Sequence, residues 1–215
     1  MLGWSVVVPV KRLELAKTRL RPAVPAAGHD RLVLAICLDT VTAALRCPDV
    51  ARVVAVTSDP VAAPALRTAG ALVVPDEPDR GLNPALEHGA ETAAQVAAGD
   101  PVATLSADLP ALRPAELGEV LAAAAGWRRS FVCDAAGSGT TLLAVQAGQP
   151  LAAAYGPASR AAHLASGAVE LRGDWPTVRC DVDTPADLQA AGALGLGSRT
   201  SALLAAVAAT PYTAH

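Results

Sequence analysis

Short runs of apolar, often β-branched residues alternate with longer stretches of helical periodicity, and this alternation constrains the fold more than any other feature. The segment "DRLVLAICLDTVTAAL" places apolar residues at steps of three and four, which is typical of a helix with one buried face. The apolar runs themselves carry few polar residues, as strands do when helices cover both faces of a sheet. We therefore expect βαβ units that form one three-layer α/β domain around a mostly parallel, mixed sheet.

The expected elements follow from these runs. Strands are predicted over 4–10, 51–57, 71–75, 101–107, 129–134 and 140–146. Helices are predicted over 29–46, 60–69, 83–98 and 114–125. The alternation weakens after residue 129, where we expect a helix near 159–166, short strands near 168–171 and 177–180, and a helix that starts at Thr184. One domain spans 1–215 in this interpretation, with about 205–215 as a frayed tail.

Charge and cysteine usage narrow the class of protein. The net charge of -3 and a pI near 5.8 argue against a nucleic-acid or anionic-membrane partner, because such proteins carry a basic patch. No apolar run approaches the roughly 18 residues of a membrane span, and the N-terminal run lacks the order of charges of a signal peptide. The four cysteines have no C-x-x-C spacing, so we expect buried thiols in a reducing cytoplasm. A homodimer is left open.

The loop after the first predicted strand is unusually basic. It carries five of the 17 Lys and Arg residues in eleven positions, and among them are Lys11 and Lys17, the only lysines of the chain. Lysine is a compact charge on a flexible stem, well suited to reaching a phosphate inside a tight loop. A solvated turn into a helix is the alternative. The loop has neither the G-x-x-x-x-G-K of a P-loop nor the G-x-G-x-x-G of dinucleotide folds.

Carboxylates follow other predicted strands, at the edge of a parallel sheet where ligands bind. Asp108 comes after the fourth strand, and Asp181 and Asp183 lie in "CDVDTPADL". Basic groups together with separated carboxylates indicate a polyphosphate and a divalent cation such as Mg²⁺. Helix capping is the alternative for the last pair, since Asp183 or Thr184 before a proline is a good N-cap.

Two further segments could bind a second anion. "GSGTT" offers backbone N–H groups and two hydroxyls, and "YGPAS" places Ser159 at a predicted helix start. An ordinary turn and an ordinary N-cap are the alternatives. No histidine is a convincing general base, and His163 is the only one near a predicted site.

Six motifs, taken together, resemble the 2-phospho-L-lactate / phosphoenolpyruvate guanylyltransferases of coenzyme F-420 biosynthesis. They are "VPVKRLELAKTRL", "GLNPAL", "SADLPAL", "GSGTTLL", "YGPASRAAH" and "RCDVDTPADL", and the resemblance spans about 4–195. That family is similar to the molybdenum-cofactor guanylyltransferases and has a glycosyltransferase-A-like sheet. "DLP" and "DVDTP" are common to the wider nucleotidyltransferase group, whereas the basic loop, "GSGTT" and "YGPAS" in this order are more specific.

The resemblance implies a role for each matching residue. Lys11 and Lys17, with Arg12, would contact the GTP phosphates, and Lys11, Lys17 and Asp108 would form the catalytic set. The base and ribose would lie along Gly81, Leu82 and Asn83. Mg²⁺ would be held by Asp108, Asp181 and Asp183. The acceptor would be held by Thr140, Gly156 and Ser159, with Thr141 as the alternative to Thr140.

The implied reaction transfers GMP from GTP to phosphoenolpyruvate or 2-phospho-L-lactate and releases pyrophosphate. The products would be enolpyruvoyl-2-diphospho-5'-guanosine or lactyl-2-diphospho-5'-guanosine, and the sequence does not choose between these acceptors and 3-phosphoglycerate. A nucleotidyltransferase for a sugar phosphate or molybdopterin, a non-catalytic GTP-binding regulator and a glycosyltransferase-A enzyme are the alternatives. Three plausible metal carboxylates argue against the regulator, and a loop suited to a triphosphate argues against the glycosyltransferase.

Overall fold

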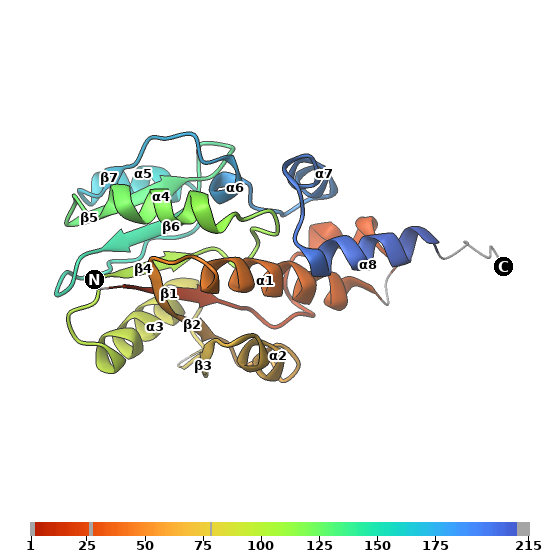
Figure 1. Ribbon diagram of the computed structural model, residues 1–215, viewed down its shortest axis with the longest axis horizontal. Coiled ribbons are helices and arrows are strands. Elements are labelled where there is room, and N and C mark those ends of the chain that lie inside the picture. The colour runs from red at the N-terminus through yellow and green to blue at the C-terminus, as the bar shows by residue number, and fades with distance from the viewer. Residues whose placement is uncertain (1–2, 26–27, 78, 210–215) are drawn as a thin grey trace.

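The computed structural model describes residues 3–25, 28–77 and 79–209 and contains strands and helices in alternation (Figure 1). The strands are β1 (Trp4–Pro9), β2 (Val50–Val56), β3 (Leu72–Val74), β4 (Val102–Leu105), β5 (Arg129–Cys133), β6 (Thr140–Val145) and β7 (Val169–Glu170). The α-helices are α1 (His29–Leu45), α2 (Ala62–Ala69), α3 (Leu82–Val96), α4 (Pro114–Ala124), α5 (Ser159–Ala165), α6 (Pro176–Arg179), α7 (Pro185–Leu194) and α8 (Ser198–Ala209). A 3-10 helix, η1 (Thr18–Ala23), follows β1.

All seven strands form one sheet in the order β3-β2-β1-β4-β6-β5-β7. The pairs β1–β2, β1–β4, β2–β3 and β5–β7 are parallel, whereas β6 runs antiparallel to both β4 and β5. The expected α/β fold with a mostly parallel, mixed sheet is therefore confirmed. From β1 the chain moves outward to β2 and β3, and it then returns to the other side of β1 with β4. The β1–β4 boundary is the point at which the strand order reverses.

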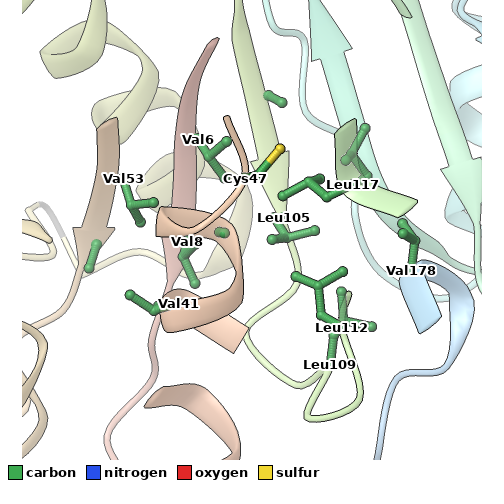
Figure 2. Packing of buried hydrophobic residues seen from close by; sticks show 14 of the residues in the cluster. Val6, Val8, Val41, Cys47, Val53, Leu105, Leu109, Leu112, Leu117 and Val178 are labelled. Atoms are coloured by element: carbon green, nitrogen blue, oxygen red, sulfur yellow. The ribbon is translucent and has the colours of Figure 1, made fainter. Parts of the chain in front are cut away.

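Successive residues of β1 supply two hydrophobic cores, one on each face of the sheet. Val6 and Val8 pack with residues of α1, α2 and α4, and Figure 2 shows part of this core between the sheet and the helices. Val7 points to the other face, where Ala85 and Leu86 of α3 cover it. This alternation is the two-residue period of a strand, and burial of both faces explains why the strand is apolar throughout.

The expected strand near 177–180 is wrong, because α6 occupies that position. Pro176 stands at the first turn, where its missing N–H costs nothing. The carboxylate of Glu116 in α4 accepts hydrogen bonds from the N–H and hydroxyl of Thr177, at 2.8 and 2.7 Å. A side chain 61 residues away thus accepts from a backbone N–H of the first turn. The sequence near α6 contains no pattern from which this contact could be predicted.

The C-terminal region also differs from the expectation of a frayed tail. Residues 205–209 belong to α8, which packs on α1, and the remaining 210–215 lie outside the described residues. Buried Asp39 of α1 accepts hydrogen bonds from the N–H groups of Arg199 and Thr200 and so caps α8.

No single described helix is long and apolar enough to span a membrane, and α7 and α8 pass that test only as a pair bent by 119°.

Candidate active site

The candidate site lies beyond the carboxyl ends of β1 and β4, where the strand order reverses. In open α/β sheets, ligands bind in the crevice at this reversal, because the loops after the two strands diverge there. The basic loop follows β1, and the segment that carries Asp108 follows β4. The chain topology therefore brings the basic loop and Asp108, 91 residues from Lys17 in the sequence, to one place.

Lys17 joins the basic loop to the carboxylates. Its ammonium forms ion pairs with the carboxylates of both Asp108 and Asp183. Burial alone lowers the pKa of Lys17, but the charges and hydrogen bonds of the two aspartates outweigh it and raise that pKa above its ordinary value. Lys17 therefore stays protonated. It also stands in a left-handed conformation with φ 52° at the start of η1, a strained position for a residue with a side chain.

Asp108 keeps one oxygen available beside this ion pair. Its Oδ1 is buried and has no hydrogen-bond partner among the described residues, whereas its Oδ2 contacts Lys17. Burial and the nearby charge of Asp108 raise the pKa of Asp181 to about 7, so a third carboxyl group lies close enough to Asp108 to interact with it. The described residues nevertheless contain no group of three His, Cys, Asp or Glu side chains arranged as metal ligands. The predicted set of three thus consists of two carboxylates that share the Lys17 ammonium and of Asp181, which lies near Asp108.

Asp59 fixes the conformation of the basic loop, and we did not predict it from the sequence. Its carboxylate accepts hydrogen bonds from the N–H of Leu13 at 2.9 Å and from the N–H groups of Val61 and Ala62 at the start of α2. Burial alone raises the pKa of Asp59, but these three donors hold it below its usual range. Its position three residues after the end of β2 and before a proline was the available signal.

Two adjoining clefts open at this end of the sheet. The first, which we call the switch-point cleft, has a volume of about 270 Å³, and its walls include Lys11, Lys17, Asp108 and Asp183. Lys11 is exposed and makes no ion pair within the described part of the chain. The cleft thus combines two cationic and two anionic side chains, the combination that a triphosphate with a divalent cation requires.

The second cleft, which we call the side cleft, measures about 210 Å³ and shares Lys11 and Leu82 with the first. Its lining is largely apolar and includes Pro9, Val10, Val56, Leu82 and Ala85. Asp76 lies in this lining, and its buried Oδ1 has no described hydrogen-bond partner. Burial, and then the like charge of Asp79, raise the pKa of Asp76. A flat apolar ring with hydrogen-bond donors on its edge matches this lining.

The predicted base-binding residues Gly81, Leu82 and Asn83, at the start of α3, do not all line the same cleft. Gly81 and Leu82 line the side cleft, and Gly81 has φ 105°, which favours glycine. The amide of Asn83 instead forms two hydrogen bonds with the backbone of Tyr155, from Nδ2 to the carbonyl at 3.0 Å and from the Tyr155 N–H to Oδ1 at 2.8 Å. Asn83 thereby attaches the segment before Gly156 to the start of α3.

Thr140 and Ser159 meet near the same end of the sheet. Since β6 runs antiparallel to β4 with Leu142 opposite Leu105, Thr140 at the start of β6 lies beside the chain that leaves β4. Ser159 Oγ donates a hydrogen bond to Thr140 Oγ1 at 3.2 Å, and both residues are buried. Thr141 Oγ1 is buried without a described partner and does not join this pair.

The predicted anion-binding loops differ in detail from the expectation. In "GSGTT", the N–H groups of Ser138 and Gly139 already bond the carboxylate of Asp134, each at 2.9 Å. In "YGPAS", Ser159 does not cap α5, since no side chain caps that helix. Gly156 has φ 139°, a conformation that side chains rarely adopt. Of the two N-caps considered for α7, Asp183 and Thr184, the structure has Thr184, with a capping box that includes Asp187.

Comparison with known proteins identifies the family of the chain. A profile of the family described as "Guanylyl transferase CofC like" matches residues 4–207. The chain belongs to this family. It is 58% identical over 207 residues to the phosphoenolpyruvate guanylyltransferase of Thermomonospora curvata, a match that covers 95% of this chain and 90% of the relative. The protein of that name from Streptomyces coelicolor is 56% identical, with 95% and 97% covered.

Solved structures share the fold, among them one described as a nucleotidyl transferase. A putative nucleotide-diphospho-sugar transferase from Desulfovibrio desulfuricans has a TM-score of 0.67 at 16% identity, with 96% of this chain and 99% of that chain covered. The Mycobacterium tuberculosis protein Rv0371c, solved in complex with manganese, has a TM-score of 0.53 at 20% identity, with 88% and 97% covered. This CofC-like chain thus has the fold of nucleotidyltransferases, and one structural neighbour was solved with a divalent metal.

Proposed function

We propose that the protein is a phosphoenolpyruvate guanylyltransferase, which transfers GMP from GTP to the phosphate of phosphoenolpyruvate and releases pyrophosphate. The observation that carries this proposal is the Lys17 ammonium, which pairs with both Asp108 and Asp183 in the wall of the switch-point cleft. Such a combination of charges suits a triphosphate with a divalent cation. The names of relatives at 58% and 56% identity support the choice of phosphoenolpyruvate over 2-phospho-L-lactate. The product, enolpyruvoyl-2-diphospho-5'-guanosine, would serve coenzyme F-420 biosynthesis in the cytoplasm, where the four free, buried thiols stay reduced.

The side cleft would bind guanine. Its apolar walls would cover the two faces of the base, and Gly81 allows the chain to turn closely beside it. Guanine carries N–H donors at N1 and at its 2-amino group on one edge, where adenine offers an acceptor. The carboxylate of Asp76 would accept from those donors, and its buried Oδ1 has no described partner that would have to be displaced.

The residues present fit a divalent cation such as Mg²⁺. Asp108 Oδ1 is buried without a described partner, and Asp108 and Asp183 already share one cationic group. Protein sites commonly hold Mg²⁺ through one or two carboxylates together with substrate phosphates, so a third carboxylate in contact is not needed. Bound there, Mg²⁺ would offset negative charge on the triphosphate and on the departing pyrophosphate.

The chemistry would need positioning more than proton transfer. An oxygen of the acceptor phosphate would form a bond to the α-phosphorus in line with the bond to pyrophosphate, which breaks. A phosphate monoester has a second pKa of about 6, so the attacking group is mostly dianionic at neutral pH and needs no general base. Lys11 and Lys17 would neutralise the phosphates, and Thr140, Ser159 and the backbone at Gly156 would orient the acceptor.

The proposal is tested by pyrophosphate release from purified protein with Mg²⁺. GTP, ATP and CTP are each paired with phosphoenolpyruvate, 2-phospho-L-lactate, 3-phosphoglycerate and a sugar 1-phosphate. We expect turnover with GTP and phosphoenolpyruvate, and at most weak turnover with the other pairs. Turnover with the sugar phosphate alone would favour a sugar nucleotidyltransferase, and tight GTP binding without pyrophosphate release from any acceptor would indicate a regulator.

A further inference from the structure

His163 occupies the centre of the predicted acceptor site without lining either cleft. It is fully buried on α5, and its ring packs against the rings of Phe131 and Tyr155, with centroids 5.5 and 5.4 Å away. Its Nε2 accepts a hydrogen bond from the N–H of Ala154 at 3.1 Å. A ring nitrogen that accepts carries no proton, so in the neutral ring the proton is on Nδ1.

The other ring nitrogen therefore acts on Thr140. Nδ1 lies 2.9 Å from Thr140 Oγ1, and with the proton on Nδ1 the imidazole is the donor. Ser159 Oγ also donates to Thr140 Oγ1. A hydroxyl has two acceptor lone pairs and one proton, and both lone pairs are now occupied. No described residue accepts the proton of Thr140, so that proton is directed away from His163 and Ser159 and remains available to an anionic ligand.

The surroundings keep the imidazole in this state. Burial, and then the positive charge of Arg129 on β5, lower the pKa of His163 to about 4. Tyr155, the titratable group in ring contact, is neutral, because burial holds its pKa above the ordinary value. The ring is therefore neutral at physiological pH and can donate at Nδ1 while it accepts at Nε2.

His163 also acts on the segment that carries Gly156. The N–H of Ala154 that bonds Nε2 lies two residues before Gly156, and Asn83 holds the Tyr155 backbone between them. The N–H of Ala153 bonds Glu87 of α3 at 2.8 Å. One buried ring thus contacts the Thr140–Ser159 pair on one side and the chain that leads to Gly156 on the other.

We infer that His163 is a positioning residue for the acceptor, which aims the Thr140 hydroxyl proton at the carboxylate or phosphate of the three-carbon acid. It touches neither substrate and acts through Thr140. The inference rests on the proposed function for the identity of the acceptor, whereas the hydrogen-bond assignment itself does not.

Two substitutions distinguish the role of Nδ1 from the role of Nε2. The side-chain amide of His163→Asn can place an N–H donor where Nδ1 stands, and it keeps the bond to Thr140 while it loses the acceptor for Ala154. The amide of His163→Gln reaches the position of Nε2, and it keeps the acceptor for Ala154 while it loses the donor to Thr140. Both variants remove a buried ring, so their losses of packing are similar.

We expect His163→Gln to raise the KM for phosphoenolpyruvate about 10-fold, the value of one hydrogen bond, and to leave the KM for GTP within about 2-fold. His163→Asn should have a KM for phosphoenolpyruvate much closer to that of the wild-type protein. Val120→Ala, a buried truncation in α4, controls for lost stability and should leave both KM values unchanged. Equal acceptor KM values in the two His163 variants, or a matching rise in both substrates' KM, would overturn the inference.

Imidazole ¹⁵N NMR of the wild-type protein gives a readout that does not depend on turnover. We expect one histidine to be neutral and protonated at Nδ1 down to about pH 5, with a signal that is absent from His163→Asn. An Nε2-protonated ring at this position would overturn the inference even if the enzyme is active. Failure of the wild-type protein to release pyrophosphate would instead contradict the proposed function and leave this assignment standing.

Discussion

At the scale of single residues, one lysine side chain links the basic loop to the carboxylates of the site. Lys17 neutralises Asp108 and Asp183, and its flexible stem allows its charge to move toward a phosphate without a change of backbone. Arginine could not do this equally, because its planar group would seek a two-point contact with one carboxylate. The use of lysine at this position, in a chain with 15 arginines, therefore has a physical reason.

Asp108→Asn should lower kcat at least about 100-fold, because the change removes a charge that transition-state stabilisation requires. The loss should persist as Mg²⁺ is raised, and pyrophosphate release over a Mg²⁺ series measures it. Asp100→Asn is the matched control, since Asp100 forms its ion pair with Arg52 just before β4, at the opposite end of that strand. Full activity of the Asp108 variant would contradict the role of this carboxylate.

At the scale of elements, the close approach of α3 to the sheet sets the position of the side cleft. Gly89 faces β1 and β2 from the middle of α3, and a Cβ there would lie 2.4 Å from Val7 Cγ1 and 2.7 Å from Val56 Cγ2. Both valines are buried and have no space to yield. The absence of a side chain at Gly89 therefore allows α3 to hold Gly81 and Leu82 against the cleft.

Gly89→Ala should destabilise the protein by about 1–3 kcal/mol, because overpacking outweighs the gain in helix propensity of about 1 kcal/mol. Gly192→Ala in α7 provides the opposite case, since a Cβ there meets nothing within 4 Å. We expect that control to be neutral or more stable by up to about 1 kcal/mol. Urea unfolding of both variants measures the difference, and equal stability would show that α3 can move away from the sheet.

At the scale of the whole molecule, the antiparallel strand β6 joins two halves that carry different parts of the site. The strands β1 to β4 place the basic loop, Asp108 and the side cleft, whereas the chain after β5 supplies Thr140, Ser159 and the segment before Gly156. The switch-point cleft draws on both halves, because Asp183 forms part of its wall. Because β6 lies between β4 and β5, it brings the start of the second half beside the end of the first. Asn83 adds a link between the halves through the Tyr155 backbone.

His163 should make global stability depend on pH. Its pKa is about 4 in the folded protein and about 6.5 when unfolded, so the unfolded chain binds more protons between these values. The stability that His163 contributes is therefore present above pH 6.5 and falls by about 2 kcal/mol between pH 7.5 and pH 5. Asp181 acts in the opposite sense, because its pKa is raised on folding.

Urea unfolding of wild-type protein and His163→Asn at pH 7.5, 6 and 5 separates the two groups. Asp181 contributes equally to both proteins, so the difference between their free energies of unfolding reports His163 alone. We expect that difference to shrink toward acidic pH, in favour of the variant. A constant difference would mean that the imidazole of His163 has the same pKa in the folded and the unfolded chain, and would contradict the lowered pKa.

Local pattern determined the strands, most helices and the charged segments at the strand ends, because periodicity and composition act over a few residues. It therefore placed Lys11, Lys17 and Asp108 at the ligand-binding edge of the sheet. The helix α6 and the α8 cap depend on Glu116 and Asp39, which lie 61 and 160 residues from their partners. Contacts at such separations have no local signature.

The same reason explains which parts of the site only the tertiary structure decided. The amide of Asn83 bonds the Tyr155 backbone, and the carboxylate of Asp59 bonds the basic loop. The tautomer of His163 follows from the hydrogen bond that the N–H of Ala154 donates to it. Each of these is a choice of hydrogen-bond partner, and packing makes that choice after the elements have formed. The sequence by itself thus determined which chemistry is present, and the fold decided how each group is oriented.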